Sequence, residues 1–336
     1  GRPSAIEKYS ASGRIVGLDI AAQSGDTNSK PNQVATPGVS GLTADFELTQ
    51  AGGKAHLAMQ HGALEFPGVF DEPSIAVDQL SADAQWQSEG EQLALQLNNA
   101  KFANADAQGE LTAQWRTADP VKSSAHSRFP GVLDLQGSLS RADGTRVYRY
   151  LPKTLPHDTR EYVHQAVQQG QASSAKFRVK GDLADMPFTN PKLGEFRIAA
   201  QVRNVTLAYV PKSLQGKDEV PWPPLAQLAG ELVFERNGMQ INGVSGSLLQ
   251  SPAVLVANAQ AQIPDLLASV LSVNGDIRGP MQEVLRFVAG SPLGGMLAHG
   301  LDKATGTGTA DAKLRLTIPL QTPEKTKVQG SVALAG

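Results

Sequence analysis

The stretch KLRLTI, residues 313–318, alternates aliphatic residues with charged or polar ones at a period of two. Leu314, Leu316 and Ile318 would lie on one side of an extended chain, and the intervening residues would lie on the other. Successive side chains of a β-strand point to opposite faces, so this period predicts a strand with one apolar and one wet face. Such strands are typical of antiparallel sheets.

The same alternation returns in KFRVK (176–180), FRIAAQV (196–202), LALQL (93–97) and HLAMQ (56–60), so a mainly β chain is predicted. The segment LVFERNGMQI (232–241) is typical of a hairpin. Turns are expected where Gly, Asn, Asp and Pro cluster. These positions are Gly52–Gly53, Gly62, Pro67–Gly68, Asn98–Asn99, Asp143–Gly144, Asn237–Gly238 and Asn274–Gly275.

One set of aliphatic and aromatic residues occupies alternate positions of these strands, and we expect it to line a single apolar face. Its members are Leu57, Met59, Leu93, Leu95, Leu133, Leu135, Phe177, Val179, Phe196, Ile198, Leu232, Phe234, Leu314 and Leu316. The basic residues between them are expected to be solvated, or, as a weaker alternative, to contact anionic head groups.

Two segments have the pattern of short amphipathic helices. In DTREYVHQAVQQG (158–170), Asp158 and Glu161 resemble a capping box and Gly170 is a natural stop, which predicts a helix near 158–169. In PMQEVLRFVAG (280–290), Pro280 suits the first turn and predicts a helix near 281–289. We expect these helices to flank or cap the apolar face, or to contact a partner.

The chain is weakly repetitive. GKAHLAMQHGALEFPGVF (53–70) aligns with GEFRIAAQVRNVTLAYVP (194–211), and each copy is followed by a strand and then a predicted helix. A repeat of this length predicts a supersecondary unit used at least twice. We expect the end of a preceding β unit and a polar loop at 1–38, repeat units at 39–185 and 186–320, and the start of a following strand at 321–336.

Composition excludes several classes of protein. The 336 residues carry 30 basic and 32 acidic side chains, so nothing in the charge favours a nucleic-acid partner. The absence of cysteine excludes disulfides and thiol catalysis, and no apolar run reaches the ~18–20 residues of a membrane span. Because the chain starts with Gly1 and stops within an alternating pattern, we expect it to be a piece of a longer protein.

No motif indicates an enzyme. HExxH, GxSxG and aspartate-rich calcium loops are absent from the sequence, and GTGTADAK (306–313) leads into a strand and lacks the end of a phosphate-binding loop. His157 and His164 flank the first predicted helix, where a solvated surface is far more plausible than a metal site. The three tryptophans are expected to be packing residues. We therefore expect no catalytic residue, no metal and no cofactor.

The segment RVYRYLPKTLPHDTREYVHQAVQQG (146–170) resembles the central region of the YhdP/AsmA-like family of bacterial envelope proteins. The resemblance extends to GALEFPGVFDEPSIAVDQLSADAQWQ (62–87) and to WPPLAQLAGELVFERNGMQINGVSG (222–246), and covers about residues 10–335. Each motif alone is moderately specific, and their order and spacing carry the resemblance.

The resemblance implies a function. It implies a segment of a periplasm-spanning phospholipid transport protein of a Gram-negative bacterium, anchored in the inner membrane through parts outside this chain and supporting outer-membrane lipid homeostasis and barrier function. The partners would be phospholipid acyl chains, conducted along a hydrophobic groove. The expected fold is an elongated, curved antiparallel sheet built from repeated β units that form the groove, with short amphipathic helices.

Two alternatives remain. A structural β-solenoid or an adhesin-like envelope protein would have a closed core and no ligand, because strands with one apolar face must cover that face in some way. An envelope hydrolase or glycan-binding module would need convergent polar groups in a pocket, and none stands out in the sequence.

Overall fold

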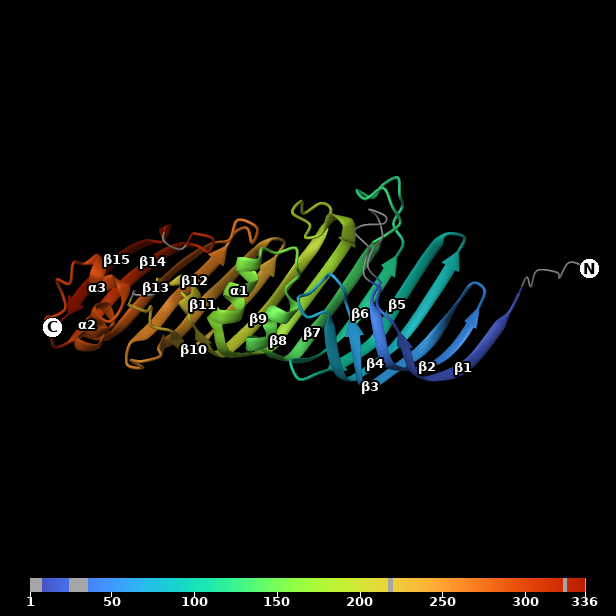
Figure 1. Ribbon diagram of the computed structural model, residues 1–336, viewed down its shortest axis with the longest axis horizontal. Helices are drawn as coiled ribbons and strands as arrows, with labels where there is room; N and C mark the ends of the chain where they lie inside the picture. Colours follow the sequence, from blue (N-terminus) through green and yellow to red (C-terminus); the bar gives the residue numbers. More distant parts are fainter. Residues whose placement is uncertain (1–7, 24–35, 217–219, 323–324, 336) are drawn as a thin grey trace, which may run out of the picture. The chain divides into compact units, whose positions relative to one another are not determined.

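The computed structural model describes residues 8–23, 36–216, 220–322 and 325–335. These residues form fifteen strands in a single antiparallel sheet, and the strand order is the order of the chain (Figure 1). The prediction of a mainly β, antiparallel fold with few short helices is confirmed. The polar loop expected within 1–38 falls largely at residues 24–35, outside the described residues.

The bounds of the elements are as follows. Strands β1 to β7 are Ser10–Ile20, Gly38–Thr49, Gly52–Glu65, Ser74–Glu89, Gln92–Ala103, Ala107–Arg116 and Val132–Asp143. Strands β8 to β15 are Val167–Asp182, Gly194–Leu207, Leu225–Glu235, Gly238–Leu248, Leu255–Ile263, Val270–Pro280, Thr309–Pro319 and Lys327–Ala335. The helices are α1 (His157–Ala166), α2 (Met281–Ala289) and α3 (Pro292–Met296), with 3-10 turns η1 (Gly144–Tyr150), η2 (Leu183–Asp185) and η3 (Lys212–Leu214).

The chain divides into two compact units, which are described separately below. Unit 1 comprises residues 1–141 and 176–198, and unit 2 comprises residues 142–175 and 199–336. The division falls within β7, β8 and β9, so each of these strands contributes one part to each unit.

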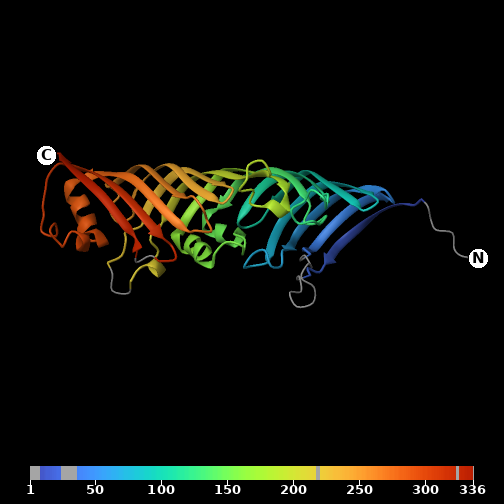
Figure 2. The ribbon, with the colours of Figure 1, turned by 90° about the horizontal axis from the view of Figure 1, so that it is seen from above.

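In unit 2, α1 and the α2–α3 pair lie on the same side of the strands (Figure 2). Tyr162 and Ala166 of α1 belong to a buried cluster with Leu271 of β13 and Ile318 of β14. The α2 residues Val284, Phe287 and Val288 form a second buried cluster with Ile277 and Ala310, which lie near the other ends of the same two strands. The two helices therefore cover opposite ends of one strand face.

The prediction for the first helix is wrong in its detail. Pro156 is the N-terminal cap of α1 and no side chain caps this end, so the expected capping box at Asp158 does not form. The helix ends at Ala166, and Val167 is already extended at the start of β8. Pairing in the sheet overrides the helical pattern of the last residues, because tertiary contacts outweigh local propensity. The second helix, α2, has the predicted bounds, with Pro280 and Gly290 as its caps.

Three predicted turns are also wrong. Gly62, Asn98–Asn99 and Asn274–Gly275 lie inside β3, β5 and β13. At Gly275, a Cβ atom would come within 2.9 Å of the Ala259 Cβ on the neighbouring strand, so the glycine permits close strand packing and not a chain reversal. The hairpin of β10 and β11 is confirmed, with Glu235 paired to Gly238.

Asn99 belongs to a set of left-handed residues that lie within the strands. In unit 1, Gly41, His61 and Asn99 have φ values of 75°, 56° and 50°. The pairing register shifts at or beside Gly41 and Asn99, which marks β-bulges. A bulge bends its strand and increases the local twist, so these residues curve the sheet of unit 1.

Unit 2 has an equivalent set. Gln227, Gly243 and Asn258 have φ values of 53°, 61° and 52°, and the register of β10, β11 and β12 shifts at these positions. Gly, Asn and other residues with tolerant backbones are the ones that adopt the left-handed region. The strands of both units are therefore bent at positions that the sequence marks only by residue type.

An aspartate on the adjacent strand holds several bulges. The amide of Gly41 donates to Asp19 Oδ1 at 2.8 Å. The side-chain amide of Asn99 donates to Asp83 Oδ2 at 2.9 Å, and that of Asn258 donates to Asp276 Oδ2 at 3.1 Å. We call these pairs bulge clamps. In each of them a charged acceptor fixes the conformation of the bent residue.

Candidate functional site

The apolar face of unit 1 is the side of the sheet that carries Leu57, Trp86 and Leu95. Leu57 of β3 is in register with Ala44 and Ala82, and Leu95 of β5 is in register with Trp86 and Trp115. Directly paired residues of an antiparallel sheet share a face, and so do residues two apart on a strand. Met59 and Leu93 therefore lie on the same face.

Close packing extends this face to β7 and β8. A Cβ atom at Gly137 would lie 2.9 Å from the Leu111 Cβ and would overlap the ring of Phe177, so these three residues share one side. Leu133 and Leu135 are four and two residues before Gly137 on β7, and Val179 is two residues after Phe177 on β8. Residues an even number apart on a strand point to the same face, so these three lie on this side too.

The opposite side is fixed by an ion pair between β8 and β9. Arg178 Nε lies 3.8 Å from Glu195 Oε2, so these two residues share the polar face. Phe196 and Ile198 therefore point to the apolar face with Phe177. All ten residues predicted in unit 1 thus lie on one face: Leu57, Met59, Leu93, Leu95, Leu133, Leu135, Phe177, Val179, Phe196 and Ile198.

This face is not uniformly buried. Leu93 is 43% exposed and Leu95 is 37% exposed, although both lie on an interior strand. Met59, by contrast, is only 2% exposed. The other predicted residues of unit 1 are half-buried. Aliphatic side chains of β5 therefore remain available to a ligand.

The four predicted residues of unit 2 also share one face. Leu232 pairs with Ile241, Ile241 with Ala261, Ala261 with Val273, and Val273 with Leu316. Phe234 is two residues from Leu232, and Leu314 is two residues from Leu316, so both point to the same face as this row. Leu316 is 1% exposed and forms part of the cluster beneath α1, so it belongs to a filled core.

Helix α3 connects the two clusters of unit 2. Leu293 packs against both the α1 cluster and the α2 cluster, and so does Leu314 of β14. The apolar face is therefore more covered at β13 and β14 than at β5 of unit 1. We therefore expect a ligand to reach the apolar face at β5 more readily than at β13 and β14.

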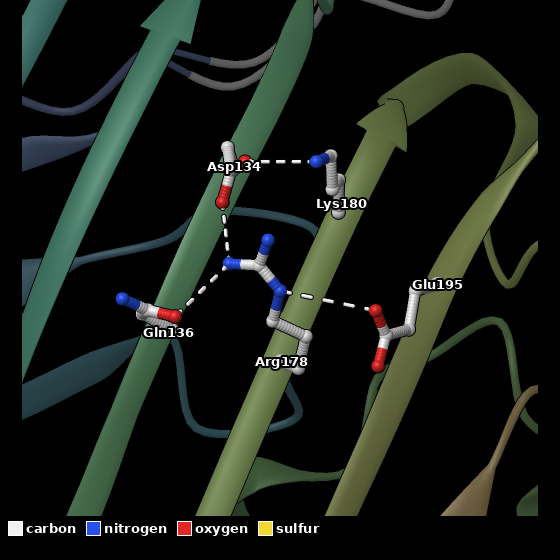
Figure 3. A network of polar contacts seen from close by, with 5 residues as sticks. All are labelled: Asp134, Gln136, Arg178, Lys180 and Glu195. Carbon is white, nitrogen blue, oxygen red and sulfur yellow. Dashed lines mark hydrogen bonds and ion pairs between the residues drawn. The ribbon is translucent and has the colours of Figure 1, made fainter.

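The polar face of unit 1 carries a charge network across β7, β8 and β9 (Figure 3). Arg178 forms an ion pair with Asp134 and donates to Gln136 Oε1 at 3.4 Å. Lys180 Nζ lies 3.5 Å from Asp134 Oδ2. The hydrogen bond from Arg178 lowers the pKa of Asp134 below its ordinary value, although burial opposes this shift. Arg178 and Lys180 are thus engaged with carboxylates.

A hollow of about 420 Å³ lies beside this network. Its lining combines polar and apolar residues of β4 to β8, which are Gln85, Gln87, Gln96, Gln114, Arg116, Asp134 and Lys180 together with Ala94, Leu95, Trp115, Val132, Leu133 and Gly181. Its lining residues contain no arrangement of acid, base and nucleophile. Leu95, Trp115 and Leu133 of the apolar face are therefore among the residues that border the hollow.

The histidines form no cluster of ligands. Within the part of the chain that the structure describes, no group of three or more His, Cys, Asp or Glu side chains could hold a metal ion. His164 stacks on Tyr148 with a ring-centroid distance of 3.8 Å, and His157 Nδ1 lies 3.9 Å from Asp158 Oδ1. His56 contributes instead to the clamp at Asp83, at 2.9 Å.

The tryptophans pack as the sequence analysis predicts. Trp222 is buried and meets Tyr209 edge to face at 5.9 Å. The ring of Trp86 lies over Gly53. The sequence did not indicate Phe129, which stacks on Trp115 at the end of the apolar face. The only signal for it was an aromatic residue beside a proline in a loop.

These features define a class of protein, namely an antiparallel β scaffold with strands in chain order and one partly open aliphatic face. The chain belongs to the YhdP protein family, whose model matches residues 4–336. The family resemblance inferred from the sequence is therefore confirmed.

One curated relative has a named activity. The chain is 30% identical over 205 residues to the "Intermembrane phospholipid transporter YhdP" of Escherichia coli K12. The match covers 60% of this chain and only 15% of that protein, so the chain spans a small part of the relative's length. No solved structure matches the chain. None of the helices formed by the described residues combines the length and apolar character needed to cross a bilayer.

Proposed function

We propose that this chain is a segment of a phospholipid transport protein and binds acyl chains along its apolar face. Membership of the YhdP family and the printed name of the E. coli relative support a lipid ligand. The observation that carries the proposal is the exposure of Leu93 and Leu95 on an interior strand of an otherwise aliphatic face. We expect all fourteen predicted residues to contribute to this face.

The energetics favour a weakly specific site. Each buried methylene contributes about 0.8 kcal/mol, so a dozen methylenes would give roughly 10 kcal/mol before the costs of binding. No head-group contact is needed at this strength. Transport along a surface also requires binding that is easily reversed, which suits aliphatic side chains better than a polar pocket. The relative's name is that of a transporter, and this supports a non-enzymatic function.

The same comparison supports a proposal about location. We propose a periplasmic position for this segment, as part of a protein anchored in the inner membrane and supporting the outer membrane's lipid content and barrier. The word "Intermembrane" in the relative's name supports an envelope location. The repeat units at 39–185 and 186–320 are part of this proposal, as successive portions of one lipid track.

The test compares two neighbouring residues that point to opposite faces. Leu95→Glu places a charge on the apolar face, whereas Gln96→Glu places it on the polar face. We expect phospholipid to co-purify with the unmodified chain and with Gln96→Glu, and to be lost with Leu95→Glu. Leu95 is 37% exposed and can carry a charge without unfolding the core. Leu316, which is buried, is not a suitable position.

The alternative of a closed core has one observation in its favour, the filled clusters of unit 2. It predicts that neither the unmodified chain nor either variant contains phospholipid. Mass spectrometry of lipids extracted from the purified proteins decides between the two functions. Equal lipid content in Leu95→Glu and Gln96→Glu would also contradict the proposed face.

A further inference from the structure

The loop of residues 117–131, which we call the β6–β7 loop, is fastened to the start of β5 in unit 1. The amide of Leu93 donates to Thr117 Oγ1 at 3.2 Å, and the amide of Thr117 donates to the Leu93 carbonyl at 2.9 Å. Arg128 forms an ion pair with Glu91 in the turn before β5. The loop therefore begins and ends beside the exposed leucines of the apolar face.

Phe129 in this loop extends the apolar face beyond the sheet. Its ring stacks on Trp115 with a centroid distance of 6.0 Å and an interplanar angle of 23°. Trp115 is paired with Leu95, and its indole nitrogen donates to the Pro130 carbonyl at 2.9 Å. Phe129 is 48% exposed. The half-buried Trp115 thus lies between two exposed apolar residues, Phe129 and Leu95.

A second loop adds apolar surface at the same end of the strands. The amide of Leu183 donates to the Gly131 carbonyl at 2.9 Å, which ties the loop of residues 183–193 to the β6–β7 loop. Met186 and Leu193 in this loop are both exposed. Isolated exposed apolar residues are ordinary, but a group at the open end of an aliphatic face is a binding-site signal.

We propose that the Trp115–Phe129 stack marks a lateral port where an acyl chain enters the apolar face of unit 1. The proposal rests on the proposed function and assigns it a position. An acyl chain could pass from Phe129 to Leu95 without crossing a polar row, because the three side chains form a continuous apolar surface. Arg128, the residue before Phe129, forms an ion pair with Glu91, so charged groups border the apolar surface of the stack. This juxtaposition suits an amphiphile better than a protein surface.

The first experiment uses photo-crosslinking in the 336-residue chain. Benzoylphenylalanine replaces Phe129, or Val69 as a control, and the protein is irradiated with vesicles of phosphatidylethanolamine and phosphatidylglycerol. Val69 is 41% exposed in the loop after β3, at the opposite end of the strands. We expect phospholipid adducts at Phe129 and not at Val69. Equal labelling, or adducts only between protein chains at Phe129, would overturn the port.

The second experiment separates the port from the face. The crosslinker is placed at Leu135, farther along the apolar face, and the rate of lipid labelling is compared in Phe129→Asp and Val69→Asp. We expect Phe129→Asp to slow labelling several-fold and Val69→Asp to leave the rate unchanged. Unchanged labelling in both would overturn the port and leave the proposed function standing. No labelling at Leu135 in the unsubstituted protein would contradict the proposed function itself.

Discussion

Glycine residues beneath aromatic rings determine how closely the strands of unit 1 pack. A Cβ atom at Gly137 would overlap the Phe177 ring and the Glu110 carbonyl, and one at Gly53 would overlap the Trp86 ring. The rings therefore lie flat across the neighbouring strand instead of standing out from the sheet. The aromatic rings therefore pack directly over the backbone of the neighbouring strand on the apolar face.

Gly137→Ala is expected to destabilise the protein by about 1–3 kcal/mol, because overpacking forces the ring or the backbone to move. Urea unfolding monitored by circular dichroism measures the change. Gly330→Ala is the matched control, because a Cβ atom there has no contact closer than 3.4 Å. A similar loss of stability in both variants would contradict the close-packing account.

The pKa of Asp134 predicts a pH dependence. It is lowered by the hydrogen bond from Arg178, so the stabilisation is present above the unfolded-state value of about 4 and is lost as the pH falls through the folded-state value. We expect Asp134→Asn to lower the urea midpoint at pH 7. The difference from the unsubstituted protein should shrink at pH 3. A difference that persists at pH 3 would show that the loss is not electrostatic.

At the scale of elements, the bulge clamps stabilise bends in the strands. The alternating sequence pattern alone would predict straight strands. Asp83 accepts hydrogen bonds from Asn99 on one neighbouring strand and contacts His56 on the other. The Asn99 hydrogen bond, followed by the His56 contact, lowers the pKa of Asp83. One exposed carboxylate of β4 thus links side chains of the two neighbouring strands, β3 and β5.

Asn99 has a φ of 50°, where a β-branched residue is strained. Asn99→Val is therefore expected to cost about 1–3 kcal/mol. Asn99→Gly removes the same hydrogen bond without backbone strain and should cost less. Thermal unfolding of the two variants measures the difference. If Asn99→Gly were the more damaging change, the hydrogen bond and not the backbone conformation would dominate.

The strands and the residues on one face could be predicted from the sequence, because a period of two is a direct consequence of strand geometry. Helix α2 could also be predicted, since Pro280 and Gly290 mark its ends. The bulges could not, because Asn98–Asn99 has the composition of a turn. The Trp115–Phe129 stack was missed since it depends on the path of a loop, which periodicity does not describe.

At the scale of the whole molecule, a ligand that binds only the folded chain must stabilise it. If the proposed function holds, a short-chain phospholipid at 100 times its dissociation constant should add about 2.7 kcal/mol to the free energy of unfolding. We expect a corresponding rise in Tm for the unsubstituted protein and for Gln96→Glu. Leu95→Glu should show a reduced rise. A rise of equal size in all three proteins would indicate binding elsewhere.

The order of the strands has a consequence for how such a chain changes in evolution. Each described strand pairs with its neighbours in sequence, so inserting or deleting a hairpin breaks no distant pairing and needs no rethreading. Two added strands lengthen a sheet by about 9–10 Å along the hydrogen-bonding direction. Their contacts are local, so the cost in folding rate is small. The length of such a sheet can thus be adjusted in hairpin-sized steps without altering the chemistry of its faces.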